Sequence, residues 1–145
     1  RAEATAADEK NGGQGVRDSQ GGTEDAGGRR GGVKRLLGES ARLGVAAGVP
    51  RERVIIDPGI GFGKTADHNW VVMRRLAELK ELGLPILIGT SRKSFIGKLL
   101  DLPVDQRVEG TAATITAAVL RGADMMRVHD VGAMRSVARV AEQIR

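Results

Sequence analysis

Three short apolar runs, each followed by a helical pattern, constrain the fold of this chain more than any other feature. The runs occupy residues 54–56, 85–88 and 125–128. A continuous apolar run of this length suits a strand covered on both faces, as in a parallel sheet. Helical spacing of apolar residues follows each run, over about 72–79, 108–121 and 131–144. These strand–loop–helix units predict a parallel α/β sheet with right-handed crossovers.

The first part of the chain has a different composition. Residues 1–32 hold nine of the 21 glycines, and Val16 is their only large apolar side chain. Such a segment cannot bury enough surface to offset the entropy of ordering it. We therefore predict a disordered tail over 1–32 and a folded domain over 33–145, which begins with a helix that Gly48 ends.

Composition excludes several classes of protein. There is no cysteine, so disulfides and cysteine-based metal sites are ruled out. No apolar run approaches the roughly 18 residues needed to span a bilayer, and the first residues lack a signal-peptide pattern. The net charge of +5 suits a small anionic ligand or a nucleic acid. The chain has no aromatic side chain near its Gly/Arg-rich segment for base stacking. We expect a cytoplasmic protein that binds neither membrane nor nucleic acid.

Candidate functional residues follow each predicted strand. In parallel α/β folds, ligands bind beyond the carboxyl ends of the strands. Asp57 follows the first run, Lys93 follows the second, and Arg127 with His129 ends the third. A carboxylate accepts paired N–H groups of a heterocycle, while lysine and arginine bind anions and arginine also stacks on planar rings. These positions predict a site for a polar ring that carries an anionic group.

Simpler explanations remain open for these residues. Asp57 is suited to capping the turn at Pro58 and Gly59, and the cations after the second run are suited to a solvated loop. Arg127, which we expect to be buried, needs a partner such as Asp124 or Asp130. The glycine-rich segment 59–64 matches neither the P-loop nor the dinucleotide motif, so it is either a connector or a place where a ligand approaches the backbone.

Taken together, these residues resemble the dihydropteroate synthase family. The segments that carry the resemblance are 55–64, 88–97, 109–113 and 127–131, in this order and spacing. The resemblance covers about 33–145 and implies an α/β fold, a partial (β/α)8 TIM barrel made of its last three βα units.

This resemblance implies a transferase of folate biosynthesis. The family condenses 6-hydroxymethyl-dihydropterin pyrophosphate with p-aminobenzoate to give dihydropteroate and pyrophosphate, assisted by Mg2+ and inhibited by sulfonamides. By resemblance, Asp57 binds the pterin, Lys93 contacts the pterin and the aminobenzoate, and Phe62 and Ser94 border the aminobenzoate. Arg127 and His129 bind the leaving pyrophosphate. Lys93 and Arg127 are the expected catalytic residues, and a homodimer is the expected assembly.

The chain also departs from the family. The asparagine-containing motif that follows the family's first strand and helps to place Mg2+ has no counterpart here, so we expect no metal ligand in this chain. Three strands cannot close a barrel, and we therefore expect little or no synthase activity from the chain alone. One alternative is the pterin-binding domain of a corrinoid methyltransferase, although 91–94 and 127–129 match the synthase better. Another is an inactive chain that pairs with a partner.

Overall fold

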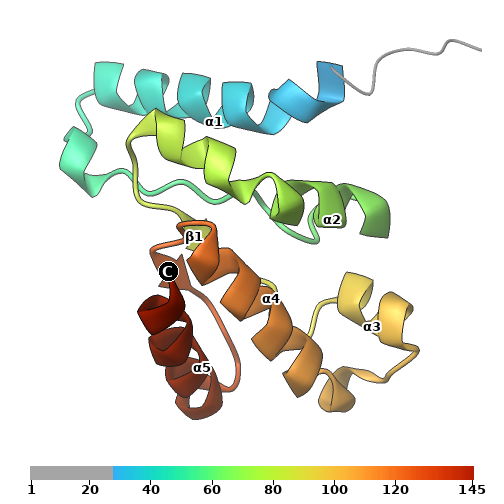
Figure 1. Ribbon diagram of the computed structural model, residues 1–145. Coiled ribbons are helices and arrows are strands. Elements are labelled where there is room, and N and C mark those ends of the chain that lie inside the picture. Colours follow the sequence, from blue (N-terminus) through green and yellow to red (C-terminus); the bar gives the residue numbers. More distant parts are fainter. Residues whose placement is uncertain (1–27) are drawn as a thin grey trace, which may run out of the picture.

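The computed structural model describes residues 28–145, which form an α/β arrangement of helices around a small parallel sheet (Figure 1). The α-helices are α1 (Gly28–Ala46), α2 (Ala66–Arg74), α3 (Ser94–Leu100), α4 (Val108–Leu120) and α5 (Val131–Ile144). The strands are β1 (Leu87–Ile88) and β2 (Met125–Met126). Short 3-10 helices occur at η1 (Arg51–Arg53), η2 (Leu76–Leu82) and η3 (Val104–Gln106). No helix within this range has both the length and the apolar character of a membrane span.

The sheet is parallel, as predicted. Strands β1 and β2 pair with Leu87 opposite Met125. On its other side, the segment that leads into β1 forms a parallel bridge between Ile86 and Ile56. The backbone of Ile56 donates to the carbonyl of Pro85 at 2.9 Å and accepts from Leu87 at 2.8 Å. The three predicted strand segments therefore lie in chain order, with β1 in the middle.

The predicted strand at 54–56 is wrong in its extent, because only Ile56 pairs. The N–H of Val54 bonds to the carbonyl of Arg51 and closes η1, so it is not free for a sheet. Ile55 is 47% exposed. Pro58 has no N–H to donate to a sheet. This segment therefore pairs with the chain that leads into β1 through a single residue.

The predicted helices are found, with two differences. The pattern over 72–79 is divided between α2 and the 3-10 helix η2, which ends at Gly83 with a φ of 62°. Helix α1 begins at Gly28, earlier than the predicted end of the tail at about Gly32. Its residues Leu37 and Ala41 pack against the main core, and this tertiary contact outweighs the low helix propensity of glycine. The rest of the predicted tail, 1–27, lies outside the described residues.

The core has two parts. The larger cluster lies around β1 and includes Ile60, Leu76, Ile86, Ile88 and Phe95, all with 1% exposure or less. Trp70 packs edge-on against Phe95, with ring centroids 4.7 Å apart. The smaller cluster joins α4 and α5, which lie side by side in Figure 1. Its buried members are Ile115, Val119, Met134, Ala138 and Ala141.

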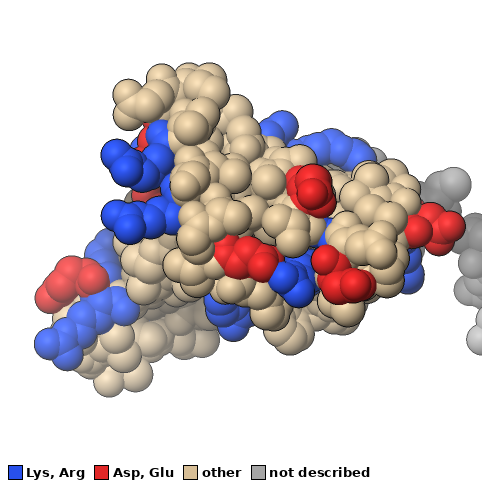
Figure 2. Space-filling view, turned by 90° about the horizontal axis from the view of Figure 1, so that it is seen from below, with Lys and Arg blue, Asp and Glu red and all other residues tan. Residues whose placement is uncertain are grey.

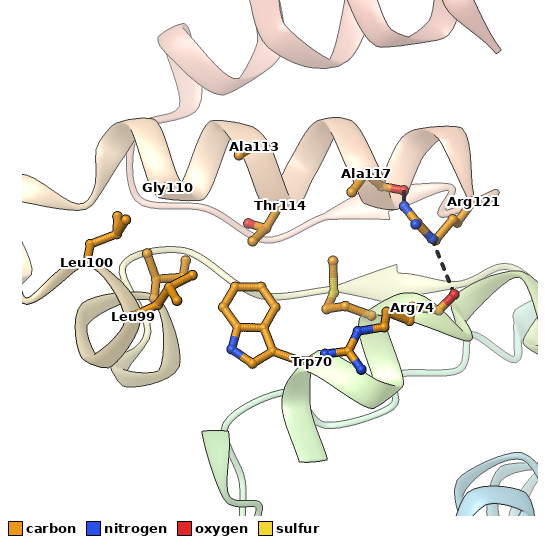
Figure 3. Close-up of a pocket in the computed structure, with 11 residues that line it drawn as sticks. Trp70, Arg74, Leu99, Leu100, Gly110, Ala113, Thr114, Ala117 and Arg121 are labelled. Carbon is orange, nitrogen blue, oxygen red and sulfur yellow. Dashed lines mark hydrogen bonds between the residues drawn. The ribbon is translucent and has the colours of Figure 1, made fainter. Parts of the chain in front are cut away.

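The surface carries an apolar groove and mixed charge. The groove, of about 270 Å³, lies between α2, α3 and α4, with Trp70 and Leu99 on its walls (Figure 3). Arg121 closes one end by donating to the carbonyls of Arg74 and Ala117. None of the predicted site residues lines it. On the face seen in Figure 2, acidic and basic side chains are interspersed, unlike the continuous basic stripe typical of nucleic-acid binding.

Candidate functional site

The loop that follows Ile56 is shaped by its glycines. Gly59, Gly61 and Gly63 have φ values of 67°, 83° and 59°, a left-handed conformation that disfavours residues with a Cβ. Asp57 is half-buried, and its Oδ1 accepts from the N–H of Gly59 at 2.8 Å. The turn-capping explanation of Asp57 is therefore confirmed. Its other carboxylate oxygen has no hydrogen bond to the described part of the chain, so it is free to accept from a ligand.

Asn69 holds this loop and was not predicted as a site residue. It lies on α2 and is only 2% exposed. Its Oδ1 accepts from the N–H of Gly61 at 2.7 Å, and its Nδ2 donates to the carbonyl of Thr65 at 2.8 Å. A local signal in the sequence could have identified it, because this asparagine lies on the same helix face as the buried Met73, four residues further on.

Lys93 lies across the glycine loop. Its Nζ donates to the carbonyl of Ile60 and stands 4.6 Å from the centre of the Phe62 ring. A Cβ on Gly61 would lie 2.8 Å from Cδ of Lys93, so this position has room only for glycine while Lys93 keeps its place. Phe62 is exposed, and the Lys93 amine lies against its ring.

The charges around Lys93 show which candidate residues meet. Burial lowers the pKa of the Lys93 amine, and the cations of Arg127 and Lys64 lower it further, while the Asp57 carboxylate acts in the opposite direction. The structure therefore brings Asp57, Phe62, Lys93 and Arg127 together at the ends of neighbouring strand segments. Cations predominate in this group, and such a site attracts an anion.

Arg127 has no ion pair with the described residues, so the proposed pairing with Asp124 or Asp130 is wrong. Asp124 accepts instead from the N–H of Ile86 at 2.9 Å, and Asp130 pairs with Arg92. The expectation that Arg127 is buried is also wrong. Strand β2 has one unpaired side among residues 28–145, and Met125 on it is 39% exposed.

The guanidinium of Arg127 lies over Gly89 at the end of β1. Its Nη2 is 3.3 Å from the point where a Cβ on Gly89 would stand. A residue with a side chain at this position would press on the guanidinium. Gly89 therefore lets Arg127 lie flat against the backbone, where one face and the N–H edge stay open to a planar or anionic ligand.

His129 is fixed by Ser91, which is 6% exposed. The N–H of His129 donates to Oγ of Ser91 at 3.1 Å, and the same oxygen lies 2.8 Å from Nδ1 of His129. One of the two arrangements that this contact allows is donation of the hydroxyl hydrogen to Nδ1. In the neutral ring, the hydrogen then stands on Nε2, which can donate to an anion. Ser94 is exposed as the first residue of α3, and its side chain has no hydrogen bond to described residues.

A metal ion does not fit the side chains in the described range. No group of three His, Asp or Glu residues is close enough to bind one ion. The acid at the site, Asp57, lies near the Lys93 amine, and the cations of Arg127 and Lys64 also act on that amine, so this group of charges opposes a further cation. The arrangement instead suits a ligand with N–H donors for the carboxylate and negative charge for the cations.

The sheet and the site define a parallel α/β protein whose candidate binding residues follow its strand segments. The family model for pterin binding enzymes matches residues 16–129, and the chain belongs to this family. The match begins before Val33, within the predicted tail, and the domain boundary at 32 stays a prediction.

The particular relatives are dihydropteroate synthases. The chain is 51% identical over 117 residues to the dihydropteroate synthase of Synechocystis, an alignment that covers 75% of this chain and 40% of that relative. It is 47% identical over 108 residues to the Bacillus subtilis enzyme, with 74% and 37% covered. The chain thus spans about 40% of the length of these curated relatives.

Solved structures confirm the predicted fold class. The dihydropteroate synthase of Coxiella burnetii in complex with pteroic acid superposes with a TM-score of 0.81 at 37% identity, over 85% of this chain and 46% of that one. The Yersinia pestis enzyme with a sulfonamide drug gives 0.76 at 38% identity, over 79% and 42%. The described residues therefore adopt part of a (β/α)8 barrel.

Proposed function

We propose that this chain supplies three strand ends of a dihydropteroate synthase site, which condenses 6-hydroxymethyl-dihydropterin pyrophosphate with p-aminobenzoate. The observation that carries the proposal is the arrangement of Asp57, Lys93 and Arg127 around the glycine loop, in a chain 51% identical to a dihydropteroate synthase. Each of the three follows a different strand segment, so the fold determines their spacing.

The pterin ring would lie between the carboxylate and the two cations. The free oxygen of Asp57 accepts from ring N–H groups, and the amine of Lys93 donates to ring acceptors. Arg127, flat over Gly89, offers its guanidinium face to the planar ring. The three contacts together fix the ring plane and its direction within that plane.

The aminobenzoate would lie beside Phe62 and Lys93. The exposed Phe62 ring provides apolar contact to the benzene ring, and the Ser94 hydroxyl at the start of α3 is free to donate to the carboxylate. A sulfonamide has a similar aromatic amine and polar end, so it would compete for the same place. Holding the amine near the reacting carbon makes a bimolecular reaction effectively unimolecular.

Arg127 and His129 would stabilise the leaving group. The amine nitrogen bonds to the pterin methylene carbon as the C–O bond breaks, and the bonding electrons leave with pyrophosphate. The nitrogen then releases one proton to solvent. Arg127 and the Nε2–H of His129 donate to the oxygens that gain charge, which lowers the barrier. The described residues do not form a Mg2+ site, and no step is assigned to a metal on this chain.

The proposal is tested by titration of the 15N-labelled chain with pteroic acid and, separately, with a sulfonamide. We expect both to shift the amide signals of Phe62 and Lys93, and Lys93→Ala to weaken both responses. The matched control is Lys98→Ala, which changes an exposed lysine on α3, the helix that Lys93 precedes, and should alter neither response. A response to pteroic acid with none to the sulfonamide would favour the methyltransferase alternative. No response to any ligand would contradict the proposal.

Turnover needs more of the barrel than these three strand ends. We propose that the other strands come from the same protein or from a partner chain, which would cover the unpaired side of β2. The purified chain alone should therefore release little or no pyrophosphate from the two substrates. The homodimer and the cytoplasmic location also stay predictions, which cross-linking and fractionation would test.

A further inference from the structure

Arg92 has an unusual backbone for a residue with a side chain. Its φ is 53°, in the left-handed region, which is costly for any residue with a Cβ. It stands between two site residues, Ser91 and Lys93. Such a conformation persists only where the surroundings hold it, and it often marks a functional position.

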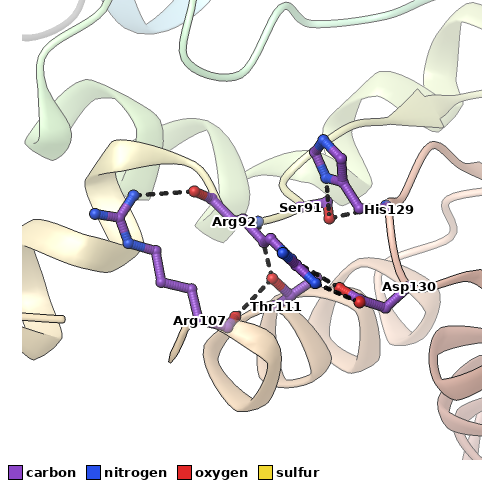
Figure 4. A network of polar contacts seen from close by, with 6 residues as sticks. All are labelled: Ser91, Arg92, Arg107, Thr111, His129 and Asp130. Atoms are coloured by element: carbon purple, nitrogen blue, oxygen red, sulfur yellow. Dashed lines mark hydrogen bonds and ion pairs between the residues drawn. The ribbon is translucent and has the colours of Figure 1, made fainter. Parts of the chain in front are cut away.

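The polar groups of Arg92 are held from three directions (Figure 4). Its N–H donates to Oγ1 of the buried Thr111 at 3.0 Å, and its carbonyl accepts from Nη1 of Arg107 at 3.0 Å. Its guanidinium forms a two-pronged ion pair with Asp130, with N–O distances of 3.0 and 2.5 Å. Thr111 and Arg107 are also joined, because the threonine hydroxyl donates to the arginine carbonyl at 2.8 Å. The backbone of Arg92 is thus fixed on both sides.

Asp130 pairs with Arg92 instead of capping the helix that follows it. It is the N-cap residue of α5, a position where an aspartate normally accepts from the first N–H groups of the helix. Its side chain makes no such bond here and turns to Arg92 instead. Arg92 lies in the loop after β1, and Asp130 lies 38 positions further on, in the loop after β2. The ion pair therefore joins these two loops.

The pair is adjacent to a site residue in each loop. Lys93 follows Arg92, and His129 precedes Asp130. The left-handed turn at Arg92 directs Ser91 inward to His129 and lets Lys93 reach the carbonyl of Ile60 on the other side. We propose that the Arg92–Asp130 ion pair is a positioning device, which holds Lys93 and His129 in the orientations that the site requires. The inference rests on the proposed function only in the identity of the ligand, because the positions of Lys93 and His129 can be measured in the chain without a ligand.

The test is Asp130→Asn in the whole chain, which keeps the shape of the side chain and removes its charge. We expect the pKa of the Lys93 amine, followed by NMR, to rise toward the ordinary value as the lysine leaves its partly buried place. The charges that act on Lys93 are those of Arg127, Lys64 and Asp57, so Asp130 reaches it through placement. The 15N shifts of the His129 ring should also change, as the ring loses its contact with Oγ of Ser91.

A second pair serves as control. Glu78→Gln breaks a two-pronged pair with Arg75, with distances of 2.6 and 2.6 Å, within one segment and outside the site. This variant should leave Lys93 and the imidazole signals unchanged. If Asp130→Asn does not fold, Arg92→Lys keeps the charges but loses the two-pronged geometry, and the same shifts are expected.

A folded variant in which Lys93 and His129 keep their wild-type signals would overturn the proposal and leave the pair a structural role only. Pteroic acid binding is measured last, on the same samples. If the wild-type chain does not bind it, the proposed function fails, while the NMR comparison still decides the positioning role.

Discussion

Replacing Asn69 by alanine tests how the glycine loop of the site is held. In the structure, this buried side chain is the link between Gly61 and helix α2, with hydrogen bonds of 2.7 and 2.8 Å. Alanine keeps the helix, because its helix propensity is high. The substitution therefore removes the two side-chain bonds and leaves the rest of the element in place.

The expected loss of stability follows from these two bonds. Each contributes a net of about 1 kcal/mol, so the unfolding free energy should fall by about 2 kcal/mol. A larger penalty is not expected, because the exposed Gly61 can bond to water and the Thr65 carbonyl keeps its bond from the Asn69 N–H at 3.1 Å. A change of about 2 kcal/mol is roughly a 30-fold change in the folding equilibrium.

The loop should also release Lys93. The Lys93 amine bonds to the carbonyl of Ile60, the residue before Gly61. When the loop is no longer held, the lysine loses part of its shielding from water, and its pKa should rise toward the ordinary value. The site and the stability are thus expected to change together.

The assay is equilibrium unfolding in urea, with an NMR titration of the Lys93 amine on the same samples. His68→Ala is the control, because His68 is the exposed neighbour of Asn69 on the same helix, and its effect should stay within about 0.5 kcal/mol. A change below about 0.5 kcal/mol for Asn69→Ala, with an unaltered Lys93 titration, would refute the reasoning.

Three further predictions concern single side chains. Arg127→Gln removes a like charge near Lys93, so the pKa of the Lys93 amine should rise in an NMR titration, and a fall would contradict the geometry. The pKa of the Asp130 carboxyl is lowered, first by its hydrogen bond from Arg92. The ion pair therefore stabilises the folded chain above about pH 4, and this stabilisation is lost as the pH falls through the lowered pKa. Urea unfolding at a series of pH values should therefore show a gap between wild type and Asp130→Asn that narrows in acid; a constant gap would oppose this. Ile88→Ala empties a fully buried position and should cost about 2 to 5 kcal/mol by urea unfolding, and a loss under 1 kcal/mol would show that the β1 core is misplaced.

The helices could be predicted because their signals are local. Apolar residues on one face of 131–144 show where α5 packs, and Gly122 shows where α4 ends, with a φ of 89°. The start of α1 could not be predicted, because its glycine-rich first turns have low propensity and contacts with the main core decide the outcome. The length of a strand at 54–56 also depends on hydrogen bonds that a sequence does not reveal, such as the one that closes η1.

Candidate site residues could be chosen from the sequence because of their place beside the predicted strands. Asp57, Lys93 and Arg127 each follow a strand, and the topology of a parallel sheet brings such positions together. The pairing of Arg92 with Asp130 could not be foreseen, because the sequence offers several acids as partners for Arg92 and for Arg127. The exposure of Arg127 follows from the unpaired side of β2 among residues 28–145, which the sequence pattern does not reveal.

The most direct test of the central claim is a chimera of two related chains. Residues 33–145 replace the matching segment of the Synechocystis dihydropteroate synthase, and pyrophosphate release is measured with the pterin pyrophosphate and p-aminobenzoate. We expect a sulfonamide-sensitive turnover that falls by about 100-fold or more with Lys93→Ala and is unchanged with Lys98→Ala. A folded chimera with no turnover, or with turnover indifferent to Lys93→Ala, would contradict it.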